Sequence, residues 1–186
     1  MELHPAIADR LDDIERIEME TQEPGVRIID KTGPLDNYAD RDHCLQYMVA
    51  IGLIFGELTA HHYTDATAKD PSIDTLREKM EVKENTTFTD EYYDLEKRAI
   101  GNSIQVHFKD GTSTDRVEVS YPIGHRVRRE EGIPVLKQKF NNSMAGVFDK
   151  DQMVAILEVF GDKLNDTPVS EFMDLFVASD KGMQLA

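Results

Sequence analysis

Cysteine is nearly absent from the sequence, which has only Cys44 among its 186 residues. A disulfide within the chain is therefore excluded, and a single thiol beside an apolar segment predicts a reducing compartment and a buried, inert side chain. No apolar run approaches the length of a membrane span, and the first residues lack the basic and apolar regions of a secretory signal. We therefore predict a cytoplasmic protein with no membrane partner.

Basic residues are also few, because 21 lysines and arginines stand against 36 acidic residues and give a formal charge of −15. This excess of negative charge argues against nucleic acid as a partner. An anionic small substrate would then need a local cluster of cations. The simpler explanation of the acidic excess is a well-solvated surface.

Motifs that would identify a cofactor or a metal are missing. The sequence has no glycine-rich phosphate loop, no Gly-x-Ser-x-Gly, no Cys-x-x-Cys and no calcium loop. His61 and His62 are adjacent, so their side chains diverge on a helix or strand, and no third ligand stands at a useful spacing. We expect neither a cofactor nor a metal site.

Alternation of apolar and polar residues predicts strands, and an i, i+3, i+4 spacing of apolar residues predicts helices. The expected strands cover the end of 12–21, then 80–84, then a hairpin of 104–108 and 117–121 around Asp110 and Gly111. The expected helices cover 38–57, with Asn37 as its N-cap, and 71–80, 135–144, 153–160 and 169–177. We expect 85–98 to be loop and turn. The fold class that follows is α+β, with a helical end.

A polar, turn-rich stretch enters the most apolar segment of the chain at residues 33–48. His43, Gln46 and Tyr47 are spaced i, i+3, i+4, so on one continuous helix they would share a face, close to Arg41. They are candidates for holding an oxygen-rich ligand, with His43 as a proton carrier near neutral pH. The alternative is that they are interior polar groups satisfied by the protein itself.

The densest positive cluster of the sequence comprises His125, Arg126, Arg128 and Arg129, between a predicted strand and a predicted helix. Planar guanidinium groups match carboxylates in a bidentate manner, so this cluster is a candidate site for a di- or tricarboxylate. The alternative is a solvated charge run that the two following glutamates neutralise.

Several motifs stand in one order along the chain. They are Gly33-Pro34-Leu35, Ala39-Asp40-Arg41-Asp42-His43-Cys44, Gln46-Tyr47-Met48, Leu76-Arg77-Glu78-Lys79-Met80, Glu96-Lys97-Arg98, Phe108-Lys109-Asp110-Gly111 and Tyr121-Pro122-Ile123-Gly124-His125-Arg126. Together they make residues 3–177 closely similar to the MmgE/PrpD family. A collinear series of this kind is far more specific than any one of its members.

The resemblance implies a domain organisation. In that family an all-helical domain comes first, an α+β lid follows, and the last helices return to the helical domain. Residues 1–132 are then expected to form the lid, with a small antiparallel sheet packed with helices. Residues 133–186 are expected to be the returning helical segment, whose partner domain is not part of this sequence.

The resemblance also implies an activity. It is the removal of water from 2-methylcitrate to give 2-methyl-cis-aconitate, in the methylcitrate cycle of propionate catabolism, by a homodimer that needs no cofactor. Citrate is an expected side substrate. The partners expected are thus a small tricarboxylate, the chain's own N-terminal helical domain and a second copy.

The main catalytic acid and base are expected in that helical domain, so no catalytic residue is assigned here beyond His43 as a minor candidate. The residues expected to close over the substrate are Lys31, Arg41, His43, Gln46 and Tyr47. The cluster of His125, Arg126, Arg128 and Arg129 is expected either to bind substrate or to dock the domains. The chain alone is expected to be inactive.

Two other functions stay open at this point. One is a different reaction of the same family on a related acid, such as citrate dehydration, decarboxylation or epimerisation. The other is a carboxylate-binding or interaction module without chemistry. Whichever holds, the apolar faces of the last helices are expected to make the chain self-associate.

Overall fold

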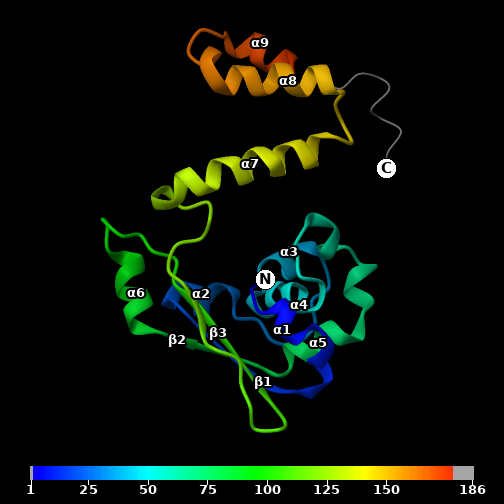
Figure 1. The fold of residues 1–186 in the computed structure, drawn as a ribbon, viewed down its shortest axis with the longest axis vertical. Coiled ribbons are helices and arrows are strands. Elements are labelled where there is room, and N and C mark those ends of the chain that lie inside the picture. Colours follow the sequence, from blue (N-terminus) through cyan, green and yellow to red (C-terminus); the bar gives the residue numbers. More distant parts are fainter. Residues whose placement is uncertain (1, 178–186) are drawn as a thin grey trace. The chain divides into compact units, whose positions relative to one another are not determined.

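The computed structural model describes residues 2–177 and divides into two compact units, Met1–Pro122 and Ile123–Ala186 (Figure 1). All the strands found among the described residues belong to the first unit. The second unit is helical wherever its described residues have regular structure. The division comes before the boundary that the sequence predicts after residue 132.

The first unit is built on a four-stranded sheet. Its strands are β1 (Ile14–Thr21), β2 (Met80–Glu84), β3 (Asn102–Phe108) and β4 (Val117–Val119), in the order β2-β1-β3-β4. β3 is antiparallel to both β1 and β4, so the predicted hairpin is confirmed. β2 is parallel to β1, because several helices carry the chain back before β2 begins. The α+β class is confirmed, and the sheet is mixed where the sequence predicts an antiparallel one.

The two faces of this sheet differ in polarity. Ile17, Met19 and Val106 point to one face and are buried, whereas their neighbours Glu18 and Glu20 point to the other, as the period of two along a strand requires. The buried residues join one hydrophobic cluster with the apolar side chains of the helices. The core therefore lies on one side of the sheet only.

Six α-helices accompany the sheet in the first unit. They are α1 (His4–Ile7), α2 (Glu23–Ile29), α3 (Tyr38–Asp42), α4 (Leu45–Phe55), α5 (Pro71–Arg77) and α6 (Thr86–Tyr93), with 3-10 turns at Ala8–Asp13, Ala60–Tyr63 and Thr67–Lys69. α1, α3 and α5 all contact α4, which is the most apolar of them (Figure 1). α4 is thus the central helix of the core.

The prediction of a single helix over 38–57 is wrong, because the chain forms two helices, α3 and α4, with a break between them. Asn37 caps α3 as predicted, and its side chain accepts a hydrogen bond from the Asp40 N–H at 3.0 Å. Cys44 then takes an extended conformation, and its buried Sγ lies 3.4 Å from the Lys31 carbonyl oxygen. Burial of the thiol, which the sequence predicts, is therefore what interrupts the helix.

The loop predicted for 85–98 is also wrong, because this stretch contains α6. Asn85 accepts hydrogen bonds from the N–H groups of Thr87 and Phe88 and so caps the helix. Phe88 is buried against Gly101, where an added Cβ would lie only 2.6 Å from the ring. The local Asn85 cap and the contact of Phe88 with Gly101 both stabilise this helix.

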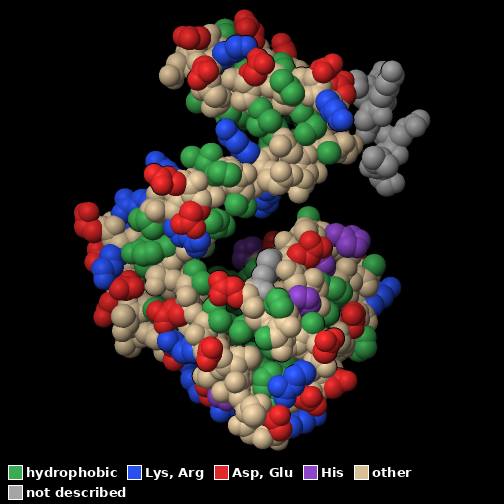
Figure 2. Space-filling view, in the orientation of Figure 1, with side chains coloured by type: hydrophobic (Ala, Val, Ile, Leu, Met, Phe, Trp, Pro, Cys, Tyr) green, Lys and Arg blue, Asp and Glu red, His purple; other side chains and the backbone are tan. Residues whose placement is uncertain are grey.

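The second unit consists of α7 (Arg129–Met144), α8 (Lys150–Glu158) and α9 (Val169–Asp174), with a 3-10 turn at Arg126–Arg128 and a π-turn at Val159–Lys163. Phe148, Phe160, Phe172 and Phe176 make edge-to-face contacts with one another. Many apolar side chains are nevertheless exposed on these helices, among them Val135, Leu136 and Met173 (Figure 2). Among residues 2–177 no helix is long and apolar enough to cross a membrane.

Glu20 gives the first unit a predictable response to acid. Its carboxylate accepts hydrogen bonds from Asn85 (3.0 Å), Arg116 (2.6 Å) and Ser103 (3.3 Å), and the Asn85 bond in particular, with the Arg116 bond and charge, lowers the pKa of Glu20. A lowered pKa contributes stability above the ordinary glutamate value of about 4.3, and that contribution is lost as the pH falls through the folded-state pKa.

We therefore expect the free energy of unfolding to fall between neutral pH and about pH 3, and to fall less in Glu20→Gln. Urea unfolding followed by circular dichroism at both pH values measures this difference. Glu15→Gln, a substitution at an exposed position of the same strand, is the matched control. If the free energy of unfolding fell by the same amount between the two pH values in the wild type and in Glu20→Gln, this role for Glu20 would be excluded.

Candidate functional site

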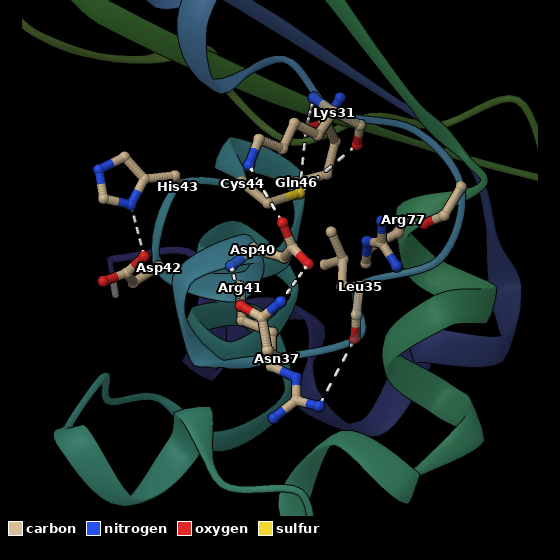
Figure 3. A network of polar contacts seen from close by, with 11 residues as sticks. Lys31, Leu35, Asn37, Asp40, Arg41, Asp42, His43, Cys44, Gln46 and Arg77 are labelled. Carbon is tan, nitrogen blue, oxygen red and sulfur yellow. Dashed lines mark hydrogen bonds and ion pairs between the residues drawn. The ribbon is translucent and has the colours of Figure 1, made fainter.

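The loop of residues 30–35 leads from α2 towards α3 and is held in place by side chains of α4 (Figure 3). Gln46 accepts a hydrogen bond from the Lys31 N–H at 3.2 Å and donates one to the Asp30 carboxylate. The Cys44 thiol, just before α4, donates to the Lys31 carbonyl. The start of the loop is therefore fixed against the beginning of α4.

Arg77, the last residue of α5, holds the middle of the same loop. Its side chain is only 8% exposed, and Nη2 donates to the Gly33 carbonyl oxygen at 2.9 Å while Nη1 pairs with Asp74. Gly33 has a φ of +83°, which glycine adopts without the strain that a side chain would add. Arg77 and Gly33 together fix the turn that follows Lys31.

Arg41 holds the end of the loop and is 4% exposed. Its Nη2 lies 3.5 Å from the Leu35 carbonyl oxygen, and its Nη1 donates to the Tyr63 carbonyl at 2.8 Å and to Asp65 at 2.7 Å. All of these acceptors belong to the protein. Arg41 therefore links α3 to the segment after α4, and its bond to the Leu35 carbonyl holds the end of the loop.

Tyr47 lies in the core at 2% exposure, and its hydroxyl donates to the His62 carbonyl at 2.7 Å. Its ring stacks on Tyr63 with the centroids 6.0 Å apart. Burial of the phenol raises the pKa of Tyr47. The hydroxyl is thus a neutral interior donor at physiological pH.

His43 is on the outside, at the C-cap of α3, with its Nδ1 bonded to the Asp42 carboxylate (Figure 3). Because the helix breaks after it, His43 does not share a face with Gln46 and Tyr47, contrary to the sequence prediction. Lys31 is 34% exposed at its side chain, and its Nζ lies 3.7 Å from Asp40.

A polar cavity of about 510 Å³ opens beside this loop. Its lining comprises Lys31, Thr32, Gly33, Pro34, Gln46, Asp74, Arg77, Glu78 and Met80. Of the five candidates in the first unit, Lys31 and Gln46 line this cavity, whereas Arg41, His43 and Tyr47 do not. The structure thus separates Lys31, which can meet a ligand there, from three buried residues that are bonded within the protein, Arg41, Gln46 and Tyr47, and from the exposed His43.

Residues 1–162 match the family model described as the MmgE/PrpD C-terminal domain. The chain belongs to the MmgE/PrpD family. It is 54% identical over 169 residues to the mitochondrial 2-methylcitrate dehydratase of Yarrowia lipolytica, covering 91% of this chain and 32% of that protein. It is 53% identical over 167 residues to the 2-methylcitrate dehydratase of Escherichia coli K12, covering 89% of this chain and 35% of that protein. The chain spans about a third of the length of the curated relatives it matches.

A second cavity of this MmgE/PrpD domain, also about 510 Å³, is an apolar groove between α4 and the sheet. Its lining includes Met19, Leu45, Met48, Val49, Leu53 and Ile104. None of the candidate substrate-binding residues lines it. With so few polar groups, this groove is suited to apolar contacts and not to a tricarboxylate.

The cationic cluster lies in the second unit of the MmgE/PrpD chain. His125 caps the 3-10 turn, since its Nδ1 accepts from the Val127 N–H at 3.3 Å. Arg128 pairs with Glu131 at 2.6 Å, and this hydrogen bond lowers the pKa of Glu131. Arg126 belongs to the turn and Arg129 begins α7. The fork of Arg128 is thus engaged by a glutamate in the first turn of the helix that follows it, α7.

Two residues of this family domain were missed in the sequence. Arg77 has no signal in periodicity, although it stands in a motif of the resemblance. His4 is half-buried, and its Nδ1 lies 2.8 Å from the Leu53 carbonyl, which fixes the ring and leaves Nε2 as the acceptor. The ring lies on Gly56, where an added Cβ would come within 2.7 Å of it. His4 is therefore a further candidate proton carrier.

Within the described part of the MmgE/PrpD domain, no group of three His, Cys, Asp or Glu side chains is placed to hold a metal ion. His61 and His62 have ring centroids 6.2 Å apart, and the Nδ1 of His62 is bonded to Thr59. The pair instead helps to close the turn after α4.

Proposed function

We propose that this chain is the C-terminal part of a hydro-lyase that converts 2-methylcitrate to 2-methyl-cis-aconitate in the methylcitrate cycle of propionate catabolism. The observation that carries the proposal is identity of about half over nearly the whole chain to proteins named 2-methylcitrate dehydratase. The polar cavity beside Lys31 is consistent with a carboxylate substrate. Citrate is the proposed side substrate.

The groups that the reaction needs are proposed to come partly from this chain and partly from a preceding domain. Dehydration of a β-hydroxy acid needs a base for the proton next to a carboxylate, an acid for the departing hydroxyl and cations for the developing charge. We assign a substrate contact to Lys31, with Arg41, Gln46 and Tyr47 as supports, and leave the main acid and base to a preceding helical domain. His43 and His4 are the proton carriers that this chain can offer.

Residues 133–186, which make up most of the second unit, are proposed to return to that helical domain after a lid of residues 1–132. The exposed apolar residues of α7, α8 and α9 support this, since faces of this kind need a partner. His125, Arg126, Arg128 and Arg129 would bind substrate or dock the two domains. A homodimer is proposed for the intact enzyme, in the cytoplasm, whereas the Yarrowia lipolytica relative is named as mitochondrial.

The proposal is tested by restoring the missing part. The 186-residue chain alone is expected to show no turnover of 2-methylcitrate. The same chain fused behind the upstream region of the Escherichia coli K12 relative is expected to produce 2-methyl-cis-aconitate, detected by chromatography of the products. The upstream region alone is the control.

Product analysis also separates this reaction from its rivals within the family. Loss of carbon dioxide or inversion of a stereocentre, in place of an alkene, would replace the proposed activity. Turnover by the isolated chain would contradict the division of labour. A folded fusion that binds citrate without any turnover would leave a binding module as the better description.

A further inference from the structure

Three of the carbonyl groups of the 30–35 loop face the protein. The oxygens of Lys31, Gly33 and Leu35 accept from Cys44, Arg77 and Arg41 respectively. In a trans peptide the N–H of the next residue points opposite to the carbonyl, so the Thr32 N–H is directed away from Cys44. The Thr32 N–H is thus directed outward, whereas the Lys31 N–H is directed to Gln46.

Three donors of Thr32 and Gly33 have no partner in the part of the chain that the structure describes. Neither the N–H groups of Thr32 and Gly33 nor the Thr32 hydroxyl makes a hydrogen bond there, although both residues line the polar cavity. Adjacent free backbone N–H groups in a turn are a common way to bind an anion.

The charged side chains near Thr32 and Gly33 also favour an anion. Lys31 Nζ is 3.7 Å from Asp40, beyond hydrogen-bonding distance, so its protons are available to another acceptor. Arg77 is already committed to Asp74 and to the Gly33 carbonyl, and its buried Nε has no partner among residues 2–177. Lys31 is thus the cation that a ligand would meet, and Arg77 is the one that fixes the loop.

The opposite side of the cavity is acidic. Asp74 and Glu78 are exposed there and belong to α5 and its C-cap. A simple dianion such as sulfate would meet these carboxylates without any donor to offer them. A hydroxy acid can instead place a carboxylate at Lys31 and direct its hydroxyl proton to the acidic side.

We propose that the loop from Lys31 to Gly33 is a preformed subsite for one carboxylate of a small hydroxy acid. Lys31 Nζ, the N–H groups of Thr32 and Gly33 and the Thr32 hydroxyl are the donors. Arg77 is a positioning residue, which acts on the ligand only through the Gly33 carbonyl. The choice of a hydroxy acid rests on the proposed function, whereas the placement of the donors does not.

Nuclear magnetic resonance of the ¹⁵N-labelled 186-residue chain tests this subsite directly. Titration with citrate is expected to shift the amide signals of Thr32 and Gly33 in a saturable manner. Lys31→Met is expected to weaken binding at least about tenfold, as the loss of one charge-assisted hydrogen bond would. Lys83→Met, in which an equally flexible lysine of β2 is removed at 64% exposure, is the matched control and is expected to bind as the wild type does.

Arg77 needs a test that separates positioning from stability. Arg77→Lys keeps the charge but cannot bond to Asp74 and Gly33 in the same geometry. We expect it to weaken citrate binding severalfold while the amide spectrum of β1 and β3 is unchanged. Thr32→Val, which removes a hydroxyl at an exposed position, is the second variant and is expected to weaken binding without altering that spectrum.

Each outcome decides the proposal. No saturable shift at Thr32 and Gly33, or equal binding by Lys31→Met, would overturn it. If sulfate shifted the amide signals of Thr32 and Gly33 as much as citrate does, the loop would be a general anion site and its proposed preference for a hydroxy acid would be rejected. Citrate binding at this loop in a chain whose fusion enzyme lacks dehydratase activity would retain the subsite and reject the proposed function, so the two can fail separately.

Discussion

Replacing Arg41 with methionine is expected to lower the free energy of unfolding of this chain by about 3 kcal/mol. Methionine keeps much of the buried volume but donates no hydrogen bond. The Tyr63 and Leu35 carbonyls would lose their donor, and Asp65 would lose its ion-pair partner. Because buried acceptors without partners cost more than the bonds themselves contribute, this is among the largest effects expected from one substitution.

The neighbouring histidine is the control for this prediction. His43 lies two residues later on the same short segment but is exposed, and among residues 2–177 its side chain bonds only to Asp42. His43→Ala is therefore expected to change stability by no more than about 0.5 kcal/mol. Urea unfolding followed by circular dichroism compares the two variants. Similar stabilities for Arg41→Met and the wild type would mean that Arg41 is not a support of the fold.

Replacing Ile17 with alanine is expected to cost about 2–5 kcal/mol. Ile17 is fully buried in β1, the strand that pairs with both β2 and β3. Its partners in register are Met80 and Val106, so the cavity would open in the middle of the sheet. A loss of this size is a large share of the 5–15 kcal/mol that typically stabilises a domain.

Thermal and urea unfolding of Ile17→Ala measure this loss, and Ile17→Val, with an expected cost of about 1 kcal/mol, checks that it scales with the volume removed. Glu18→Gln is the matched control, because Glu18 is the next residue but points to the charged face. An equal effect of Glu18→Gln would contradict the assignment of the core to one face.

The local elements could largely be predicted because their signals are short-range. The alternation in β3 and the turn at Asp110 and Gly111 specify the hairpin, and Gly111 has the positive φ, +83°, that such a turn favours. Asn37 was correctly identified as a cap because the Ncap preference is local. The α+β class followed from these elements alone.

Most of the incorrect predictions of secondary structure concern elements that depend on contacts between residues far apart in the sequence. The apolar period continues through Cys44, yet the helix breaks there because the thiol turns toward Lys31. The pairing of β2 with β1 is likewise non-local, since no sequence pattern states which strands become neighbours. The prediction of a loop at 85–98 instead overlooks local signals, because Asn85 caps α6 and Phe88 and Tyr92 are spaced i, i+4.

For the candidate site, the sequence likewise indicates the residues but not where their side chains lie. Residue types and the motif series pointed to Lys31, Arg41, Gln46 and Tyr47, all of which do gather around the 30–35 loop or its supports. The sequence could not separate a donor that faces a cavity from one that faces the core. Arg77 was missed because it comes from α5, some forty residues beyond the loop it holds.

The class of the fold, the Asn37 cap, the hairpin, the single buried thiol and the family follow from the sequence, because each depends on residue identity or on neighbours along the chain. The break before α4, the mixed sheet and the direction of the loop carbonyls follow instead from contacts in the folded protein. These depend on burial and on hydrogen bonds between segments far apart in sequence, and such bonds turn the carbonyls of Lys31, Gly33 and Leu35 inward.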